Sequence, residues 1–137
     1  LLYMAARAQL WAEKVAPALK QNKCVVLDRW LSSTCAYQGY AGGFGVDNVI
    51  RIANDSLERV WADLTIVLDV DIETALRRLS HAPDRIEQKG KDYHRMVREG
   101  FLELAGTRED IVVVDGSGEI DAIHQQIVRI VSQASFR

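Results

Sequence analysis

The chain of 137 residues carries 17 basic and 19 acidic residues, which give a formal net charge of −2. This balance produces no basic field of the kind that attracts nucleic acid or an anionic membrane, so we expect neither as a partner. A hydrophobic fraction of 48% and a charged fraction of 26% are typical of a globular protein of one domain. Cys24 and Cys35 are too few for a disulfide framework and predict reduced thiols in a cytoplasmic protein.

Helical patterns and short apolar runs alternate along the chain. Apolar residues recur about every 3.6 positions in segments that we predict to be helices, namely 1–20, 46–61, 72–79, 93–106 and 120–134. Pro17 is expected to kink or break the first of these helices. Asp71 is a candidate N-cap, and Gly106 is a candidate C-cap.

Three continuous apolar runs predict strands that are buried on both faces: 24–28, 64–70 and 111–115. Strands that alternate with helices predict an α/β fold, with a parallel sheet, helices on both faces, and a single domain over residues 1–137. Because ligands of such folds bind beyond the carboxyl ends of the strands, the residues that follow these runs are the first candidates for a site.

Asp28 and Arg29 lie at the carboxyl end of the first predicted strand. A carboxylate there can orient Mg²⁺ or its water, and a guanidinium can bind two phosphate oxygens. A simple ion pair at a strand end is an equally good interpretation of these two residues alone.

The next segment, 32–39, combines three hydroxyls, a phenol and an amide. If the segment is helical, four side chains share one face and can contact the edge of a base and its sugar: Ser33, Thr34, Tyr37 and Gln38. A capped helix start with solvent contacts is the alternative, and spacing alone favours it.

Tyr3 and Arg7 are four residues apart and share a helix face, where they can stack on a base and bind its edge. A core tyrosine beside a surface arginine is the alternative. Farther along, the region from Arg77 to Lys89 is basic and can close over phosphoryl oxygens, or else form a solvated basic face.

Taken together, these residues resemble bacterial thymidylate kinases. The run Asp28-Arg29-Trp30 with Ser33-Thr34-x-Ala36-Tyr37-Gln38-Gly39 is similar to the Asp-Arg-aromatic and Ser-Ser/Thr-x-Ala-Tyr-Gln-Gly signature of that family. The segment Tyr3-x-Ala5-Ala6-Arg7-x-Gln9 resembles its Phe-x-Ala-x-Arg-x-Gln helix. Residues 64–71, 84–88 and 97–105 match in the same register, so the resemblance extends over the whole chain.

The resemblance implies a P-loop nucleoside monophosphate kinase that forms homodimers and transfers a phosphoryl group from ATP to dTMP with Mg²⁺. The residues that it implies for substrate binding are Tyr3, Arg7, Arg29, Ser33, Thr34, Tyr37 and Gln38. Those implied for catalysis are Asp28, Arg29 and Arg85, with Arg77 and Arg85 at the nucleotide cofactor and Asp28 and Glu87 at the metal.

The sequence also departs from the family pattern. It contains no Gly-x-x-x-x-Gly-Lys-Ser/Thr phosphate loop, so we expect an N-terminally incomplete domain that lacks the first strand of the sheet as well. Gly42 replaces an arginine found in many members, and the lid, at about residues 80–91, is short. We expect this chain alone to bind dTMP weakly and to turn over little.

The loss of a central strand should leave strand edges unpaired, unless the remaining strands close together or pair with another chain. Two alternative functions also stay open. One is another nucleoside monophosphate or deoxynucleoside kinase, and the other is a non-catalytic nucleotide-binding or dimerisation module.

Overall fold

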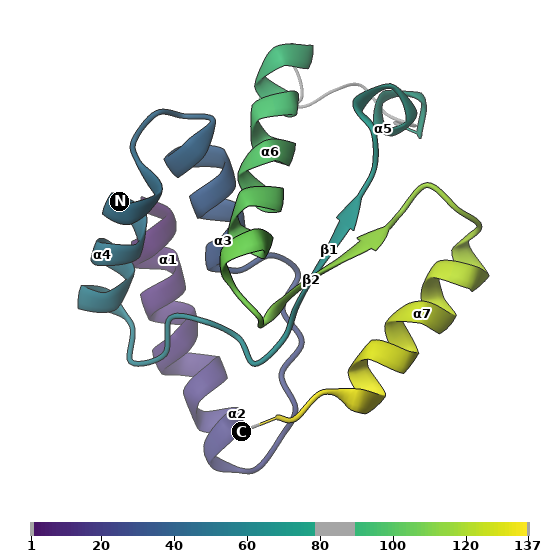
Figure 1. Cartoon of the computed structure of the whole chain (residues 1–137). Coiled ribbons are helices and arrows are strands. Elements are labelled where there is room, and N and C mark those ends of the chain that lie inside the picture. The colour runs from purple at the N-terminus through teal and green to yellow at the C-terminus, as the bar shows by residue number, and fades with distance from the viewer. Residues whose placement is uncertain (1, 79–89, 137) are drawn as a thin grey trace. The chain divides into compact units, whose positions relative to one another are not determined.

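The computed structural model describes residues 2–78 and 90–136, and Figure 1 traces their helices and strands. The chain divides into two compact units, Leu1–Trp61 and Ala62–Arg137. The single domain expected over residues 1–137 stays a prediction.

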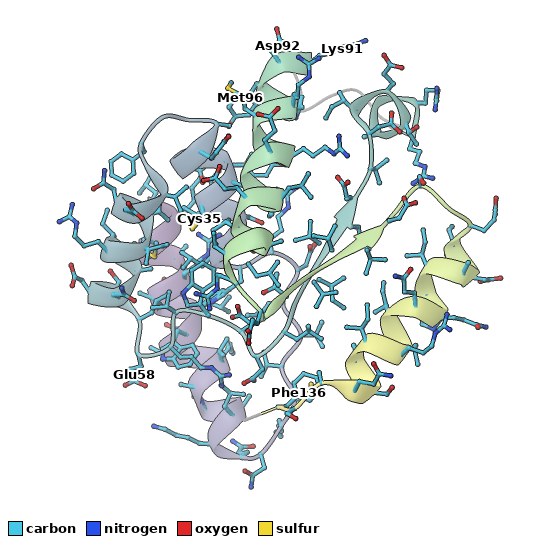
Figure 2. The ribbon with its side chains drawn as sticks, viewed as in Figure 1. Cys35, Glu58, Lys91, Asp92, Met96 and Phe136 are labelled. Atoms are coloured by element: carbon cyan, nitrogen blue, oxygen red, sulfur yellow. The ribbon has the colours of Figure 1, made fainter. Side chains whose placement is uncertain are left out.

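The first unit is helical. Its elements in chain order are α1 (Leu2–Leu10), η1 (Trp11–Val15), α2 (Ala16–Lys20), α3 (Leu31–Thr34), η2 (Cys35–Tyr40) and α4 (Val46–Ser56). Helices α1 and α4 lie side by side, and η2 packs against α4 (Figure 1). Figure 2 shows Cys35 among these helices, where its side chain is fully buried together with that of Leu31.

The predicted break near Pro17 is present as a turn of π-helix at η1. Proline has no N–H, so Pro17 cannot donate a hydrogen bond to the carbonyl of Glu13 four residues before it. The backbone widens instead, and the N–H of Ala16 donates to the carbonyl of Trp11.

The predicted strand at 24–28 is wrong. Residues 23–27 belong to no helix or strand, and the sheet that the described residues form contains only the two strands of the second unit. Burial alternates along the segment: Val25 and Leu27 are half-buried, whereas Cys24 and Val26 are exposed, Val26 by 89%. A strand needs a partner for its backbone N–H and C=O groups, and no described strand pairs with this segment.

Helix α4 ends at Ser56, five residues before the predicted end. The apolar pattern continues through Leu57, but Leu57 is extended and is buried outside the helix. The hydroxyl of Ser56 donates to the carbonyl of Ile52 at 2.7 Å, a side-chain bond that competes with helix continuation.

The second unit contains the sheet. Strands β1 (Thr65–Asp69) and β2 (Ile111–Asp115) pair in parallel, with Asp69 opposite Asp115. Helices α6 (Lys91–Thr107) and α7 (Ile120–Gln133) contact β2 from opposite sides of the sheet (Figure 1). The predicted parallel α/β arrangement with helices on both faces is therefore confirmed in this unit, where Val114 is fully buried.

Two predicted helix ends in this unit have different outcomes. Helix α5 (Ile72–Arg78) begins after Asp71, whose carboxylate accepts the N–H of Thr74 at 2.8 Å, which confirms the N-cap. The predicted C-cap at Gly106 is wrong, because α6 continues to Thr107 and Arg108 occupies the cap. The hydroxyl of Thr107 donates to the carbonyl of Leu104 at 3.0 Å in this last turn.

Candidate functional site

Arg7 lies on α1 and is held by the chain that precedes α3. Its Nη2 donates to the carbonyl of Trp30 at 2.9 Å, and its Nη1 lies 3.4 Å from the carbonyl of Tyr3. The guanidinium carbon also lies 5.9 Å from the centroid of the Trp30 ring, within the range of a cation–π contact. Desolvation by burial lowers the pKa of Arg7, while the Coulombic effects of Cys35 and Tyr3 oppose that shift.

Arg29 adopts an uncommon backbone conformation, with a φ of +65°. A non-glycine residue in this left-handed region is held there against a conformational cost, and such residues concentrate at functional sites. The guanidinium carbon of Arg29 lies 5.2 Å from the centroid of the Tyr37 ring, and its Nη2 lies 3.5 Å from the Tyr37 hydroxyl. The structure therefore brings two of the predicted site residues together.

The segment that carries the hydroxyls is helical, as α3 and η2, so the condition for its side chains to share a face is met. Ser33 and Thr34 are buried, whereas Tyr37 and Gln38 are half-buried. The Thr34 hydroxyl has no hydrogen-bond partner among the described residues, although only 7% of the residue is exposed. A buried polar atom without a partner costs free energy unless a ligand or water satisfies it, so Thr34 is a candidate ligand contact.

The loop after η2 returns to the same segment. The N–H of Phe44 donates to the carbonyl of Gln38 at 3.1 Å, and the N–H of Gly45 donates to that of Gly39 at 2.9 Å. A Cβ at Gly42 would lie 2.7 Å from the Gln38 oxygen and 3.0 Å from the Tyr37 oxygen. A side chain at position 42 would therefore require the backbone to shift, so this close approach favours glycine.

The other predicted residues of the first unit are accessible. Tyr3 is exposed on α1, which suits stacking on a base and contradicts the alternative of a core tyrosine. Asp28 is exposed beside Arg29. Among the described residues, Asp28 belongs to no group of three or more side chains that could hold a metal.

In the second unit, the neighbouring residues Arg77 and Arg78 have different hydrogen-bond partners. Arg77, which we predicted at the nucleotide cofactor, is exposed and donates to the hydroxyl of Thr74 at 2.7 Å. Arg78 donates instead to the carbonyls of Gly116 and Ser117 at 2.6 and 2.9 Å, and so holds the loop after β2.

Arg98 on α6 forms two hydrogen bonds to Asp69 at the end of β1, at 2.6 and 2.8 Å. These bonds lower the pKa of Asp69 and raise that of Arg98. Beside this pair, Asp115 accepts hydrogen bonds from the hydroxyl and the N–H of Ser117. These bonds, the hydroxyl's most of all, lower the pKa of Asp115. The carboxylates at the strand ends are therefore engaged within the unit.

Sequence reasoning missed the contacts of Trp30, Arg78 and Arg98. Their partners are 23 to 39 residues away, and no spacing rule reports contacts at that separation. Arg85, Glu87 and most of the predicted lid lie outside the described residues. Gly90, at the C-terminal end of that region, is described and has a φ of +86° as the N-cap of α6.

Comparison with known proteins shows which family the chain resembles. The family model for thymidylate kinase matches residues 1–127. The chain belongs to the thymidylate kinase family. The resemblance read from its motifs is thus confirmed.

Curated thymidylate kinases show how much of the family the chain covers. The chain is 39% identical to the thymidylate kinase of Kosmotoga olearia over 132 residues. The matched region covers 94% of this chain and 64% of that relative. The chain is 36% identical over 135 residues to that of Caldanaerobacter subterraneus, covering 97% of this chain and 65% of the relative. The chain therefore spans less than two thirds of the length of these relatives.

The crystal structure of thymidylate kinase from Ehrlichia chaffeensis has the same fold, with a TM-score of 0.73 and 24% identity, over 95% of this chain and 61% of that one. The prediction of the nucleoside monophosphate kinase fold is confirmed by this likeness. Within residues 2–78 and 90–136, no helix combines the length and the apolar character that crossing a membrane would require.

Proposed function

We propose that the complete protein phosphorylates dTMP to dTDP with ATP and Mg²⁺, and that residues 1–61 of this chain form its dTMP site. The observation that carries the proposal is that one unit contains two arginine–aromatic pairs and a buried hydroxyl without a described partner. Arg7 contacts Trp30 and Arg29 contacts Tyr37, while the hydroxyl of Thr34 in the same unit has no described partner. Membership of the thymidylate kinase family supports the same substrate.

Each of these groups has a chemical role in the proposal. The exposed ring of Tyr3 stacks on thymine, and Thr34 and Gln38 bind the thymine edge, with Ser33 beside them. Arg7 binds the edge of the base and supports the substrate phosphate, and Arg29 binds phosphate oxygens, because a guanidinium offers several N–H donors in one plane. Tyr37 lies against the deoxyribose, where a ribose 2′-hydroxyl would collide.

The donor side of the reaction has less support from these residues. A Gly-x-x-x-x-Gly-Lys-Ser/Thr loop, whose N–H groups and lysine hold the β- and γ-phosphates, does not occur in the 137 residues. Asp28 can contribute one carboxylate to Mg²⁺, in a site completed by phosphate oxygens and water. The residues described do not by themselves fit ATP, so we assign them no step in the phosphoryl transfer. The roles of Arg77, Arg85 and Glu87 stay part of the proposal, as do a homodimer and a cytoplasmic location.

Isothermal titration calorimetry of this chain with nucleotides tests the proposal. We expect weak binding of dTMP, weaker binding of dUMP and dGMP, and the weakest binding of UMP. Binding of UMP that equals that of dTMP would contradict the assignment of Tyr37 to the deoxyribose. Absence of any nucleotide binding would contradict the dTMP site itself.

A turnover assay with ATP, Mg²⁺ and dTMP tests the assignment of the donor side. We expect little or no dTDP from this chain, because the residues that would hold the β- and γ-phosphates are not in its sequence. Turnover at the level of a full-length family member would show that another part of the chain supplies the phosphate site.

A further inference from the structure

We propose that Trp30 is a positioning residue that holds the guanidinium of Arg7 in the orientation needed to bind the nucleotide. This inference rests on the proposed function for its ligand, but its structural part can be tested without one. Trp30 is 8% exposed and precedes α3, and its indole N–H donates to the carbonyl of Val60 at 2.9 Å. The side chain is therefore anchored at its polar end to a residue thirty positions away.

The anchored Trp30 contacts Arg7 twice. Its carbonyl accepts the Nη2 of Arg7 at 2.9 Å, and its ring lies 5.9 Å from the guanidinium carbon. A planar guanidinium that is fixed by a hydrogen bond along its edge and by a ring has lost most of its rotational freedom. Its orientation is then set before a ligand arrives, which lowers the entropic cost of binding.

The contacts leave Arg7 able to bind a ligand. Its hydrogen bonds to the carbonyls of Trp30 and Tyr3 use one donor on each terminal nitrogen. Guanidinium carries about five N–H donors, so a majority are not used by the described contacts. Burial lowers the pKa of Arg7, so contacts that stabilise its charge matter more here than they would for an exposed arginine.

Substitutions at Trp30 separate this role from simple packing. Trp30→Leu removes both the ring face and the indole anchor, and we expect it to weaken dTMP binding about tenfold. Trp30→Phe keeps an aromatic face and should recover part of that loss. Trp11→Phe is the matched control, since the indole N–H of Trp11 is also buried but has no partner among the described residues. We expect this control to bind dTMP as the unsubstituted chain does.

A double-mutant cycle shows whether Trp30 acts through Arg7. In a chain with Arg7→Lys, which cannot make the same planar contacts, adding Trp30→Leu should cause no further loss of dTMP affinity. Equal losses in the two backgrounds would overturn the proposal, because Trp30 would then affect binding by another route. Unchanged affinity in Trp30→Leu would overturn it as well.

The side-chain Nε–H resonance of Arg7 provides a readout without nucleotide. We expect a sharp and dispersed resonance in the unsubstituted chain and in Trp30→Phe, assigned by its loss in Arg7→Lys. In Trp30→Leu the resonance should move to the position of a solvent-exposed arginine. If the unsubstituted chain binds no dTMP but shows this pattern, the proposed function fails while the positioning role stands. The positioning role fails if the resonance is unchanged in Trp30→Leu. If Trp30→Leu is unfolded, Trp30→Phe decides: the role also fails if this variant binds dTMP with no loss although its Arg7 resonance is that of an exposed arginine.

Discussion

Arg29 in the first unit follows an apolar segment, and Arg98 in the second unit contacts the end of the apolar strand β1. The two arginines are nevertheless held in different ways. Arg98 forms two hydrogen bonds with Asp69, so each charge neutralises the other. Arg29 contacts the ring and hydroxyl of Tyr37, and no ion pair of Arg29 is described in residues 2–78 and 90–136. A guanidinium that lies over a ring can still pair with an anionic ligand, whereas a guanidinium paired with a carboxylate already has its counterion.

The same difference extends to the hydroxyls of the two units. Ser117 satisfies Asp115 in the loop after β2, at 2.6 and 2.8 Å. Thr34 is buried without a described partner. Unused hydrogen-bonding capacity in the first unit supports our proposal that this unit binds the ligand, whereas the polar groups at the strand ends of the second unit already have partners.

The largest expected effect concerns the core that supports the first unit. Leu31 is fully buried at the start of α3, directly before the hydroxyl residues. Leu31→Ala should lower the free energy of unfolding by about 2–5 kcal/mol, because it removes apolar contacts and leaves a cavity. Urea denaturation measures this change. Leu10→Ala, at a residue that is 41% exposed, is the control and should cost no more than about 0.5 kcal/mol. Equal costs at the two positions would contradict the packing of this unit.

Breaking the ion pair of the second unit comes next. Arg98→Met leaves Asp69 without its partner and should cost about 1.5–3 kcal/mol in urea denaturation, toward the lower value because the side chain is 39% exposed. Arg95→Met is the matched control on the same helix, since Arg95 and Asp92 are 61% and 90% exposed. Figure 2 shows Asp92 at the start of α6. The control should cost at most about 0.5 kcal/mol, and a larger loss there than at Arg98 would refute the structural role of Asp69 and Arg98.

The same pair predicts a pH dependence. The two hydrogen bonds from Arg98 hold the pKa of Asp69 below its unfolded value. The pair therefore stabilises the fold at any pH above the unfolded pKa, and this contribution is lost as the pH falls through the lowered value. The stability difference between the unsubstituted chain and Arg98→Met should shrink as the solution becomes strongly acidic. A difference that grows in acid would reverse the sign and exclude this origin.

A smaller effect is expected in the loop beside the candidate site. Gly42→Ala places a Cβ 2.7 Å from the Gln38 carbonyl, and the resulting backbone shift should cost about 1–2 kcal/mol. Gly118→Ala is the control, because nothing lies within 4 Å of its Cβ position and its φ is not in the left-handed region. Thermal denaturation compares the two variants. If Gly42→Ala is as stable as the control, the loop does not depend on this close approach.

The smallest effect on stability is expected at Thr34, where the effect on binding separates the units most clearly. Thr34→Val removes a hydroxyl without a described partner, so the free energy of unfolding should change by less than about 0.5 kcal/mol. Calorimetry should nevertheless show dTMP binding weakened about 3- to 10-fold, with recovery in Thr34→Ser. A strongly destabilised Thr34→Val chain would mean that the hydroxyl is satisfied within the protein and is not available to a ligand.

Most of the fold could be predicted from local pattern. The apolar runs that become the two strands, the N-cap at Asp71 and the break before Pro17 each depend on residues within a few positions of one another. The strand at 24–28 could not be judged in this way, because its apolar run is identical whether or not a partner strand is present. The end of α4 was predicted wrongly for a related reason. Leu57 fits the helical spacing, but its backbone is extended and its side chain is buried outside the helix.

The sequence by itself determined the family, the α/β class and the types of residue at the candidate site, since motif chemistry and periodicity are written along the chain. Only the tertiary structure decided which of those residues meet. Arg7 donates a hydrogen bond to Trp30, and Arg29 contacts the ring of Tyr37. The Thr34 hydroxyl is buried without a described partner, and Asp69 accepts hydrogen bonds from Arg98. Such contacts depend on how each unit packs, and a guanidinium has the same sequence signature whether its charge is neutralised by a carboxylate or held over a ring.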